Sequence, residues 1–371
     1  MTRHWLAILA LNAVIALGLR AIVAPQPIYS DRETYEQIGQ RGFAPDCKAD
    51  IFCYRVLVPV LLERVPLPSE QRWRAQEALS VILAGFVLAV ATGRVLAGRL
   101  APALATILAQ TSFGLTYTAY DPYTVDAVVY LIASLFALAW FADWPVLAAL
   151  VGVVGVFVKQ TAVLLAATPA LAALIMSHAP RRAAWIRQGL LAALVFGSFA
   201  LGMDRFAGWS LASHSPSADF LGGGWLIVWL RQEGWYLGSF YVFAPFACAW
   251  LYAVLGWRWA PPRLRALGLA AIPTMLALVY VQTTERALGT YFFAVVPLAT
   301  ACLVRLPTPV ALAAALTNGL FTAKVGLSSP WLPSSALLLM PAAVVCAYVL
   351  WIDLGLAEVL AARRTRRQPA E

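Results

Sequence analysis

Long apolar runs recur from one end of the chain to the other, separated by short polar segments. Most runs hold about 17 to 20 residues, enough for an α-helix to cross the hydrocarbon core of a bilayer. We therefore predict an all-α polytopic membrane protein with about twelve spans. The expected spans are 4–24, 79–98, 101–118, 125–142, 145–158, 160–177, 188–204, 238–257, 267–283, 287–304, 308–325 and 334–353. The segment 145–177 is compatible with either one long helix or two short ones.

Composition supports this class. Of 371 residues, 61% are hydrophobic and only 12% are charged, about half the charge of a typical soluble protein. The first apolar run lacks a clear small-residue cleavage site, which indicates a retained span rather than a removed signal peptide. The net charge of +9 does not indicate a nucleic-acid partner, because the arginines cluster in short loops, as orientation signals do.

The arginines predict the orientation in the membrane. One side of the twelve-span topology holds Arg94, Arg99, Arg181, Arg182, Arg187, Arg258, Arg263, Arg265, Arg305, Arg363, Arg364, Arg366 and Arg367. By the positive-inside rule this side is cytoplasmic, and both termini lie there. We expect a single integral-membrane domain over 1–371. It comprises an N-terminal module 1–187 with an outer loop 25–78, C-terminal helices 188–353 with an outer loop 205–237, and a basic cytoplasmic tail 354–371.

The first outer loop has two further features. Its apolar piece YRVLVPVLL is too short to span, so we expect it to lie at the interface or to dip into the bilayer and return. Cys47 and Cys53 lie in the same loop with five residues between them. An oxidising outer face would favour a disulfide between them, and two unpaired thiols are the alternative.

Charged and polar residues converge at the outer ends of the expected helices. They are Asp31, Arg55, Asp121, Asp126, Lys159, Gln160, Asp204, Arg205, Glu285, Arg286 and Lys324. Ionisable groups at membrane depth are rare and usually face a cavity or a partner. Acids there can deprotonate a nucleophile or hold a metal ion, and bases can bind a phosphate. A lipid-linked phosphate, with its tail in the membrane lipid, is the ligand that this pattern favours.

Each of these residues also has a purely structural interpretation. Asp121 precedes a proline and is a good N-cap for a following helix. Asp126 lies about 7 Å deeper along a helix axis, where pairing with a base explains it better than capping. Lys159 can snorkel to the surface, and Glu285 and Arg286 can mark a loop.

Five short motifs carry a resemblance to a known family. They are SDRETYEQIG with Asp31, YDPYTVD with Asp121 and Asp126, YRVLVPVLL with Tyr54, Arg55 and Pro59, GVVGVFVKQT with Lys159 and Gln160, and ERALGTYFFAVVP with Arg286 and Pro297. This layout resembles the GT-C superfamily of integral-membrane glycosyltransferases, which use polyprenyl-phosphate sugars. The chain departs from the pattern in two places. Gln160 stands where the family usually has an acid, and no large soluble domain follows the last expected span.

The resemblance implies an inverting transfer of a sugar from a polyprenyl-phosphate-linked donor to an acceptor on the outer face. Asp31 would be the general base that activates an acceptor hydroxyl; without that role it is a loop acid or an N-cap. Asp121 or Asp126 would orient the acceptor or ligate a divalent cation such as Mg²⁺ or Mn²⁺.

The same resemblance assigns the donor phosphate to three cations, namely Arg55, Lys159 and Arg286. Supporting positions are Tyr35, Gln160 and Glu285. The location that it implies is the inner, cytoplasmic membrane of a bacterium, with the active site on the outer face.

Two other functions compete with this interpretation. Twelve spans also suit a transporter or a flippase of lipid-linked sugars, although the charges lie at one face and the halves show no clear repeat. A non-catalytic membrane subunit is the other alternative. No Walker A, GxGxxG, HExxH or GxSxG motif indicates a soluble-type enzyme. The three histidines, His4, His178 and His214, do not indicate a histidine-based metal site.

Overall fold

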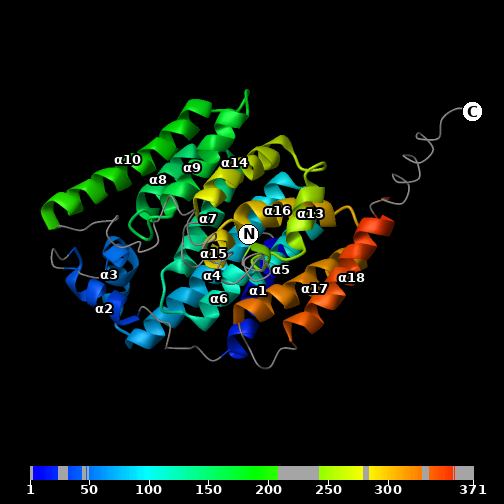
Figure 1. The fold of residues 1–371 in the computed structure, drawn as a ribbon, viewed down its shortest axis with the longest axis horizontal. Helices are drawn as coiled ribbons and strands as arrows, with labels where there is room; N and C mark the ends of the chain where they lie inside the picture. The colour runs from blue at the N-terminus through cyan, green and yellow to red at the C-terminus, as the bar shows by residue number, and fades with distance from the viewer. Residues whose placement is uncertain are drawn as a thin grey trace, which may run out of the picture.

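The computed structural model describes residues 3–23, 32–43, 47, 50–207, 242–278, 284–327, 334–353 and 355. In this part of the chain every regular element is a helix and no strand occurs (Figure 1). The first half contains α1 (Arg3–Ala21), α2 (Arg32–Arg41), the 3-10 helix η2 (Asp50–Tyr54), α3 (Leu57–Glu63), α4 (Ser69–Val95), α5 (Leu100–Gln110), α6 (Phe113–Tyr120), α7 (Asp126–Ala142), α8 (Pro145–Gly155), α9 (Ala162–Ile175) and α10 (Arg182–Ala207). The second half contains α13 (Ala249–Gly256), α14 (Pro262–Leu278), α15 (Thr284–Gly289), α16 (Phe292–Leu303), α17 (Thr308–Leu327), α18 (Ser335–Tyr348) and the π-helical turn η4 (Val349–Asp353).

Four of the described helices are long and apolar enough to cross a membrane, by length and composition: α1, α4, α10 and α17. Shorter apolar helices pack among them, so the architecture is compatible with an α-helical membrane protein. Helix α4 begins at Ser69, ten residues before the predicted span 79–98. The polar end of the first outer loop is therefore the first part of a helix, which differs from the prediction.

Several predicted spans are broken in the structure. The predicted span 101–118 is divided into α5 and α6, and the span 287–304 falls on α15 and α16. The segment 145–177 forms two helices, α8 and α9, as the second of the two alternatives predicts. The apolar pattern locates these segments but does not show where each one is interrupted.

Side-chain hydrogen bonds accompany the break between α5 and α6. The hydroxyl of Thr111 donates a hydrogen bond to the carbonyl of Ile107 (2.6 Å), and the hydroxyl of Ser112 donates to the carbonyl of Ala109 (2.7 Å). Such side-chain bonds offer the backbone carbonyls an alternative to the helical pattern. Phe113 then starts the next helix, with its amide directed to the carbonyl of Pro245 (3.4 Å).

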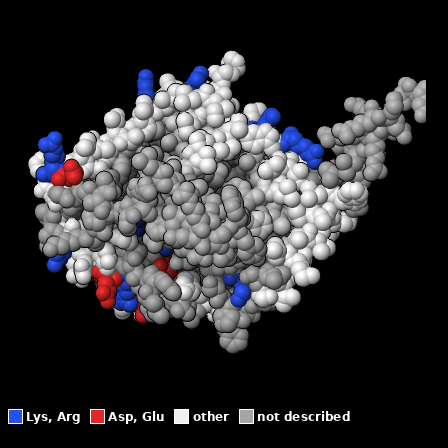
Figure 2. All heavy atoms as spheres, in the orientation of Figure 1, with Lys and Arg blue, Asp and Glu red and all other residues white. Residues whose placement is uncertain are grey.

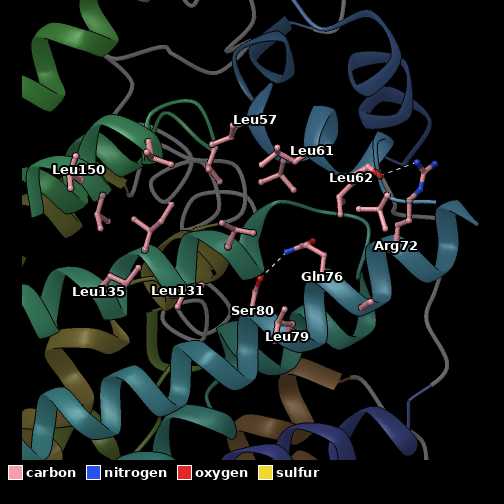
Figure 3. Close-up of a pocket in the computed structure, with 18 of the residues that line it drawn as sticks. Leu57, Leu61, Leu62, Arg72, Gln76, Leu79, Ser80, Leu131, Leu135 and Leu150 are labelled. Atoms are coloured by element: carbon pink, nitrogen blue, oxygen red, sulfur yellow. Dashed lines mark hydrogen bonds between the residues drawn. The ribbon is translucent and has the colours of Figure 1, made fainter. Parts of the chain in front are cut away.

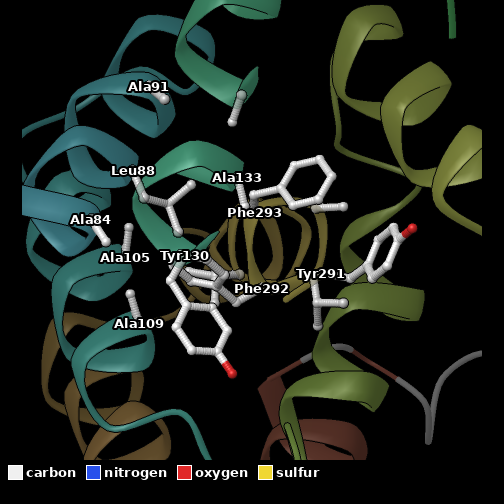
Figure 4. Close-up of a cluster of buried hydrophobic side chains, with 14 of the residues drawn as sticks. Ala84, Leu88, Ala91, Ala105, Ala109, Tyr130, Ala133, Tyr291, Phe292 and Phe293 are labelled. Carbon is white, nitrogen blue, oxygen red and sulfur yellow. The ribbon is translucent and has the colours of Figure 1, made fainter. Parts of the chain in front are cut away.

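Helix α16 lies in the middle of the bundle, and all of its residues are buried. Figure 4 shows small side chains of α4 and α5 facing aromatic rings from α7 and the start of α16. Tyr130 packs edge-on against Phe292, with ring centroids 5.8 Å apart. Small residues let helix backbones approach closely, and the rings fill the remaining space. At the margin of the bundle, α10 exposes Leu190, Leu194 and Leu201 (Figure 1).

Buried polar side chains fasten α1 to its neighbours. The amide of Gln110 donates to the amide oxygen of Asn12 (2.9 Å). In the last turn of α1, the guanidinium of Arg20 forms a two-pronged ion pair with Glu77 of α4. The hydroxyl of Thr118 donates to the same carboxylate (2.6 Å). Because Glu77 is almost fully buried, these bonds satisfy a charge that would otherwise be costly to bury.

Charged residues lie mainly at the margins of the bundle. Figure 2 shows Lys and Arg side chains along the upper and right margins, and acidic and basic side chains together at the left and lower margins. Asp143 follows α7 in the left-handed conformation (φ 58°). It accepts a hydrogen bond from the indole of Trp185 (3.1 Å) and pairs with Arg263 (3.4 Å). These contacts connect the end of α7 to α10 and α14.

Close contact between α13 and α16 gives a test of the packing. A Cβ atom at Gly256 would lie 2.0 Å from the carbonyl oxygen of Leu298, whereas a Cβ at Gly197 of α10 would meet nothing within 4 Å. We expect Gly256→Ala to destabilise the fold by about 1–3 kcal/mol or more, because two backbones must separate. Gly197→Ala is the matched control and gains about 1 kcal/mol of helix propensity. Thermal unfolding of the detergent-solubilised variants measures both, and equal melting temperatures would contradict this packing.

Candidate functional site

A buried carboxylate with two cationic partners lies at the start of α7. One oxygen of Asp126 is 2.5 Å from Nζ of Lys159, and the other is 2.5 Å from Nη2 of Arg286. These residues lie 33 and 160 positions from Asp126 along the chain. The side chain of Asp126 is 8% exposed, and those of its partners are 20% and 18% exposed. The structure therefore brings together one predicted acid and two predicted phosphate ligands.

Arg55 lies beside this trio and has neutral partners. It donates to the hydroxyl of Tyr35 (2.9 Å) and to the amide oxygen of Gln160 (3.3 Å). Its guanidinium lies over the ring of Phe52, 4.5 Å from the centroid. Within the described residues, Arg55 forms no ion pair. We call Arg55, Lys159, Arg286 and Asp126 the cationic cluster; it contains three cations and one carboxylate.

The break between α8 and α9 places Lys159. Helix α8 ends at Gly155, and the amides of Val158 and Lys159 both bond to its carbonyl (3.0 Å each). The carbonyl of Phe157 accepts from the amide of Leu57 (3.0 Å), which joins this turn to the start of α3. The ammonium of Lys159 consequently reaches Asp126 inside the protein. This differs from the alternative in which Lys159 snorkels to the surface.

The short helix α15 places Arg286. Its guanidinium lies over the ring of Tyr117, 4.6 Å from the centroid, and its carbonyl accepts from the hydroxyl of Tyr130 (3.3 Å). A Cβ atom at Gly289 would come within 3.2 Å of the backbone of Gly114, so α15 packs closely against α6. Glu285 lies next to Arg286 on the same helix. These two residues are therefore part of a helix, and the loop interpretation is wrong.

Asp121 does not cap a helix that begins at Pro122, so that prediction is wrong. Its backbone amide bonds to the carbonyl of Tyr117 (3.0 Å) at the end of α6, and α7 begins only at Asp126. Residues 121–125 form no helix, so no helix starts at Pro122 for Asp121 to cap; Asp121 has φ −124° and ψ 83°. The side chain of Asp121 is 1% exposed, which makes it a second buried acid near the cationic cluster.

The predicted outer segment forms a small helical layer that supports Tyr35 and Arg55. Helix α2 packs on α3 so closely that a Cβ atom at Gly39 would lie 2.9 Å from the carbonyl oxygen of Pro59. Partial burial raises the pKa of Glu36 on α2, but hydrogen bonds from Arg32 and Ser69 outweigh it, so that pKa lies below its ordinary value. Arg32 also lies over the ring of Tyr123, 5.1 Å from the centroid, in the segment between α6 and α7.

Two other predicted features fall in this outer segment. Cys47 and Cys53 are joined by a disulfide, with their Cα atoms 6.1 Å apart. Asp31, the predicted general base, lies outside the described residues. In the described part of the chain, no group of three or more His, Cys, Asp and Glu side chains could hold a metal ion. Both oxygens of Asp126 contact cations instead.

An apolar groove is lined by residues one to three positions along the chain from Arg55 and Lys159, but by none of the four residues of the cationic cluster. Its volume is about 670 Å³, and it lies between α3, α4, α7 and α8 (Figure 3). The lining is made mostly of branched aliphatic side chains, among them Leu57, Leu61, Leu62, Leu79, Leu131, Leu135 and Leu150. Arg72, Gln76 and Ser80 supply its polar residues. Val158, the residue before Lys159, and Val58, three residues after Arg55, also line it.

Sequence reasoning missed this groove and the ring of Tyr117. The leucines of the groove have the pattern of ordinary lipid-facing residues, so no local signal marks them.

Comparison with protein-family models, with curated proteins and with solved structures found no match. The site must therefore be interpreted from its own geometry: an excess of positive charge next to an apolar groove suits a ligand with an anionic head and an apolar tail.

Thiol labelling tests the arrangement of the five cysteines. Cys248, Cys302 and Cys346 are free and buried, while Cys47 and Cys53 form the disulfide. We expect an alkylating reagent to label three cysteines in the unreduced, SDS-unfolded protein and five after reduction. Mass spectrometry counts the labels. Cys53→Ser is the control and should give four labels in both conditions; five labels on the unreduced native chain would show that the disulfide is absent.

Proposed function

We propose that this protein is a membrane glycosyltransferase that moves a sugar from a polyprenyl-phosphate donor to an acceptor on the outer face of the membrane. The observation that carries this proposal is the apolar groove lined by chain neighbours of Arg55 and Lys159. A polyprenyl chain would occupy the groove, and its phosphate would lie against Arg55, Lys159 and Arg286. The resemblance of the short motifs to the GT-C superfamily supports the same assignment.

The charges favour a phosphate as the head group. Arginine binds phosphate oxygens with a planar fork of donors, and lysine contributes a compact charge. Arg55 is the cation best placed to make the first contact, because its present partners, Tyr35 and Gln160, are neutral. Solvent is largely excluded from the cluster, so each charge acts through a lower effective dielectric than in water.

The groove contributes orientation more than affinity. A polyprenyl chain that leaves the bilayer exchanges one apolar environment for another, so the hydrophobic effect gives little net gain. The walls from α3, α7 and α8 instead fix the direction from which the phosphate enters. We expect selectivity for an amphiphile to come from this combination of direction and charge.

The reaction is a single displacement at the anomeric carbon. The acceptor hydroxyl oxygen forms a bond to that carbon, and the bond from the carbon to the donor phosphate oxygen breaks, with inversion. The hydroxyl proton passes to Asp31 as general base. The leaving polyprenyl phosphate keeps the bonding electrons, and the cations stabilise its negative charge. Asp121 would orient the acceptor.

The proposed topology places this chemistry on the outer side of a bacterial inner membrane, with about twelve spans and both termini in the cytoplasm. In Figure 2, Lys and Arg side chains lie without acidic ones along the upper and right margins, whereas the left and lower margins carry both, which supports this orientation. The cationic cluster lies near α2 and α3, which belong to the proposed outer segment.

Lipid-phosphate binding tests the ligand. In nanodiscs, we expect Arg55→Gln to weaken binding of a polyprenyl monophosphate about 10- to 100-fold, because a charge-assisted contact is lost. Arg74→Gln is the matched control, since Arg74 forms an exposed pair with Glu70, and should bind as the native protein does. A direct titration with radiolabelled lipid gives the dissociation constants.

A substitution in the groove distinguishes binding of the polyprenyl chain from binding of the phosphate head group. Leu131→Trp should weaken binding of the polyprenyl monophosphate and leave inorganic phosphate unaffected, whereas Leu194→Trp on the exposed face of α10 should change neither. Equal affinity of the native protein for polyprenyl phosphate and polyprenol would overturn the assignment of a phosphate ligand.

Transfer is tested separately at the general base. Asp31→Asn should bind the donor lipid normally and lose at least about 100-fold in sugar transfer, since general-base catalysis contributes on the order of 10²–10⁴-fold. The rate of transfer is measured as labelled sugar that appears in products, and it is compared with the rate of the native protein in the same membranes. Full activity in Asp31→Asn would remove Asp31 from that role. Lipid movement between leaflets without transfer would favour the flippase alternative.

A further inference from the structure

We infer that Asp126 is a built-in competitor of the ligand's phosphate for Lys159 and Arg286. In the structure its carboxylate occupies the place between these two cations, and it regains them when the phosphate leaves. Asp126 thus positions both cations while the site is empty and hastens release of the lipid-phosphate product. This inference rests on the proposed function, because it requires an anionic lipid to enter the cationic cluster.

The geometry around Asp126 matches that of a bound phosphodiester. Each carboxylate oxygen faces a different cation at 2.5 Å. A phosphodiester likewise carries one negative charge over two non-bridging oxygens. A phosphodiester can therefore take the same place between Lys159 and Arg286, while the displaced carboxylate of Asp126 stays nearby and adds its charge to the site.

The helix itself does not require this carboxylate. The N-cap position of α7 is Val125, and no side chain caps there. The amides of Val128 and Val129 already bond to the carbonyl of Val125 (3.1 and 3.2 Å). The backbone amide of Asp126 bonds to the hydroxyl of Thr124 (3.4 Å). The side chain of Asp126 instead forms the two ion pairs with Lys159 and Arg286, and these are the contacts for which a ligand phosphate would compete.

The number of charges in the cluster allows Asp126 to keep a cationic partner when a phosphate enters. The cluster has three cations for one carboxylate, so a second anion can enter while Asp126 keeps one partner. Arg55 offers the entering phosphate its first contact, because it has no ion pair to break among the described residues. The phosphate and Asp126 then compete for the other two cations, Lys159 and Arg286. Asp121, which is buried, and Glu285, next to Arg286 on α15, add negative charge near the cluster and reduce its excess of positive charge.

A purely structural tie predicts the opposite result. If Asp126 only holds α7, the turn before α9 and α15 together, then its removal disorders the cations and weakens anion binding. If it competes with the ligand, then its removal frees two cations and strengthens binding. The sign of the change in affinity therefore distinguishes the two roles.

The test uses the native full-length chain in nanodiscs with a polyprenyl monophosphate as the probe. We expect Asp126→Asn to bind this lipid about 10- to 100-fold more tightly than the native protein, because a close like charge has been removed. Its dissociation should slow by a similar factor. Asp143→Asn is the matched control: Asp143 is ion-paired at the opposite end of the same helix, and its replacement should leave the affinity unchanged.

A charge-balanced pair keeps the test decisive if Asp126→Asn fails to fold. Lys159→Gln alone leaves Asp126 to compete for Arg286, whereas Lys159→Gln with Asp126→Asn leaves Arg286 free. The double variant should bind the lipid phosphate more tightly than the single one. Equal or weaker binding in a folded variant would overturn the inference. If the native protein itself binds no lipid phosphate, the proposed function fails instead.

Discussion

A carboxylate buried among apolar helices is stable only while cations stand beside it. Asp126 meets this condition through Lys159 and Arg286, which come from the turn before α9 and from α15. Removing one partner would leave the carboxylate with a single cation, and removing both would leave its charge uncompensated in a medium of low dielectric. The relative positions of α7, α9 and α15 are therefore tied to one charge, and Arg55 joins the outer helical layer to the same point through Tyr35 and Gln160.

This requirement gives a reason for the broken helices. In an unbroken helix over 145–177, the position of Lys159 would be fixed by the helical repeat. The turn after Gly155 instead lets the side chain of Lys159 reach Asp126 at the start of α7. The segment 287–304 is similar, because α15 is a separate short helix that directs Arg286 inward. Short helices have more ends, and each end has backbone groups without helical partners. The turns at these breaks satisfy several of those groups by local bonds, as at Gly155.

The sequence allows the helical class and the cationic residues to be predicted, because apolar runs and rare charges are local signals. Their meeting point depends on helix breaks, which hydropathy does not show. The N-cap predicted at Asp121 fails because residues 122–125 form no helix and α7 begins only at Asp126. The groove could not be predicted at all: Leu131 and Leu135 have the spacing of lipid-facing residues, and only the arrangement of α3, α4, α7 and α8 makes them line a cavity.

Neither the groove nor the cationic cluster alone would select a ligand. Within a bilayer, an apolar wall offers an isoprenoid or acyl chain little that the surrounding lipid lacks. A cationic site alone would attract any anion that reaches the membrane boundary. Under the proposed function, the two together would select a phosphate at a fixed distance and direction from an apolar chain. The carboxylate of Asp126 adds a third condition, since an anion must hold the cations better than Asp126 does in order to stay.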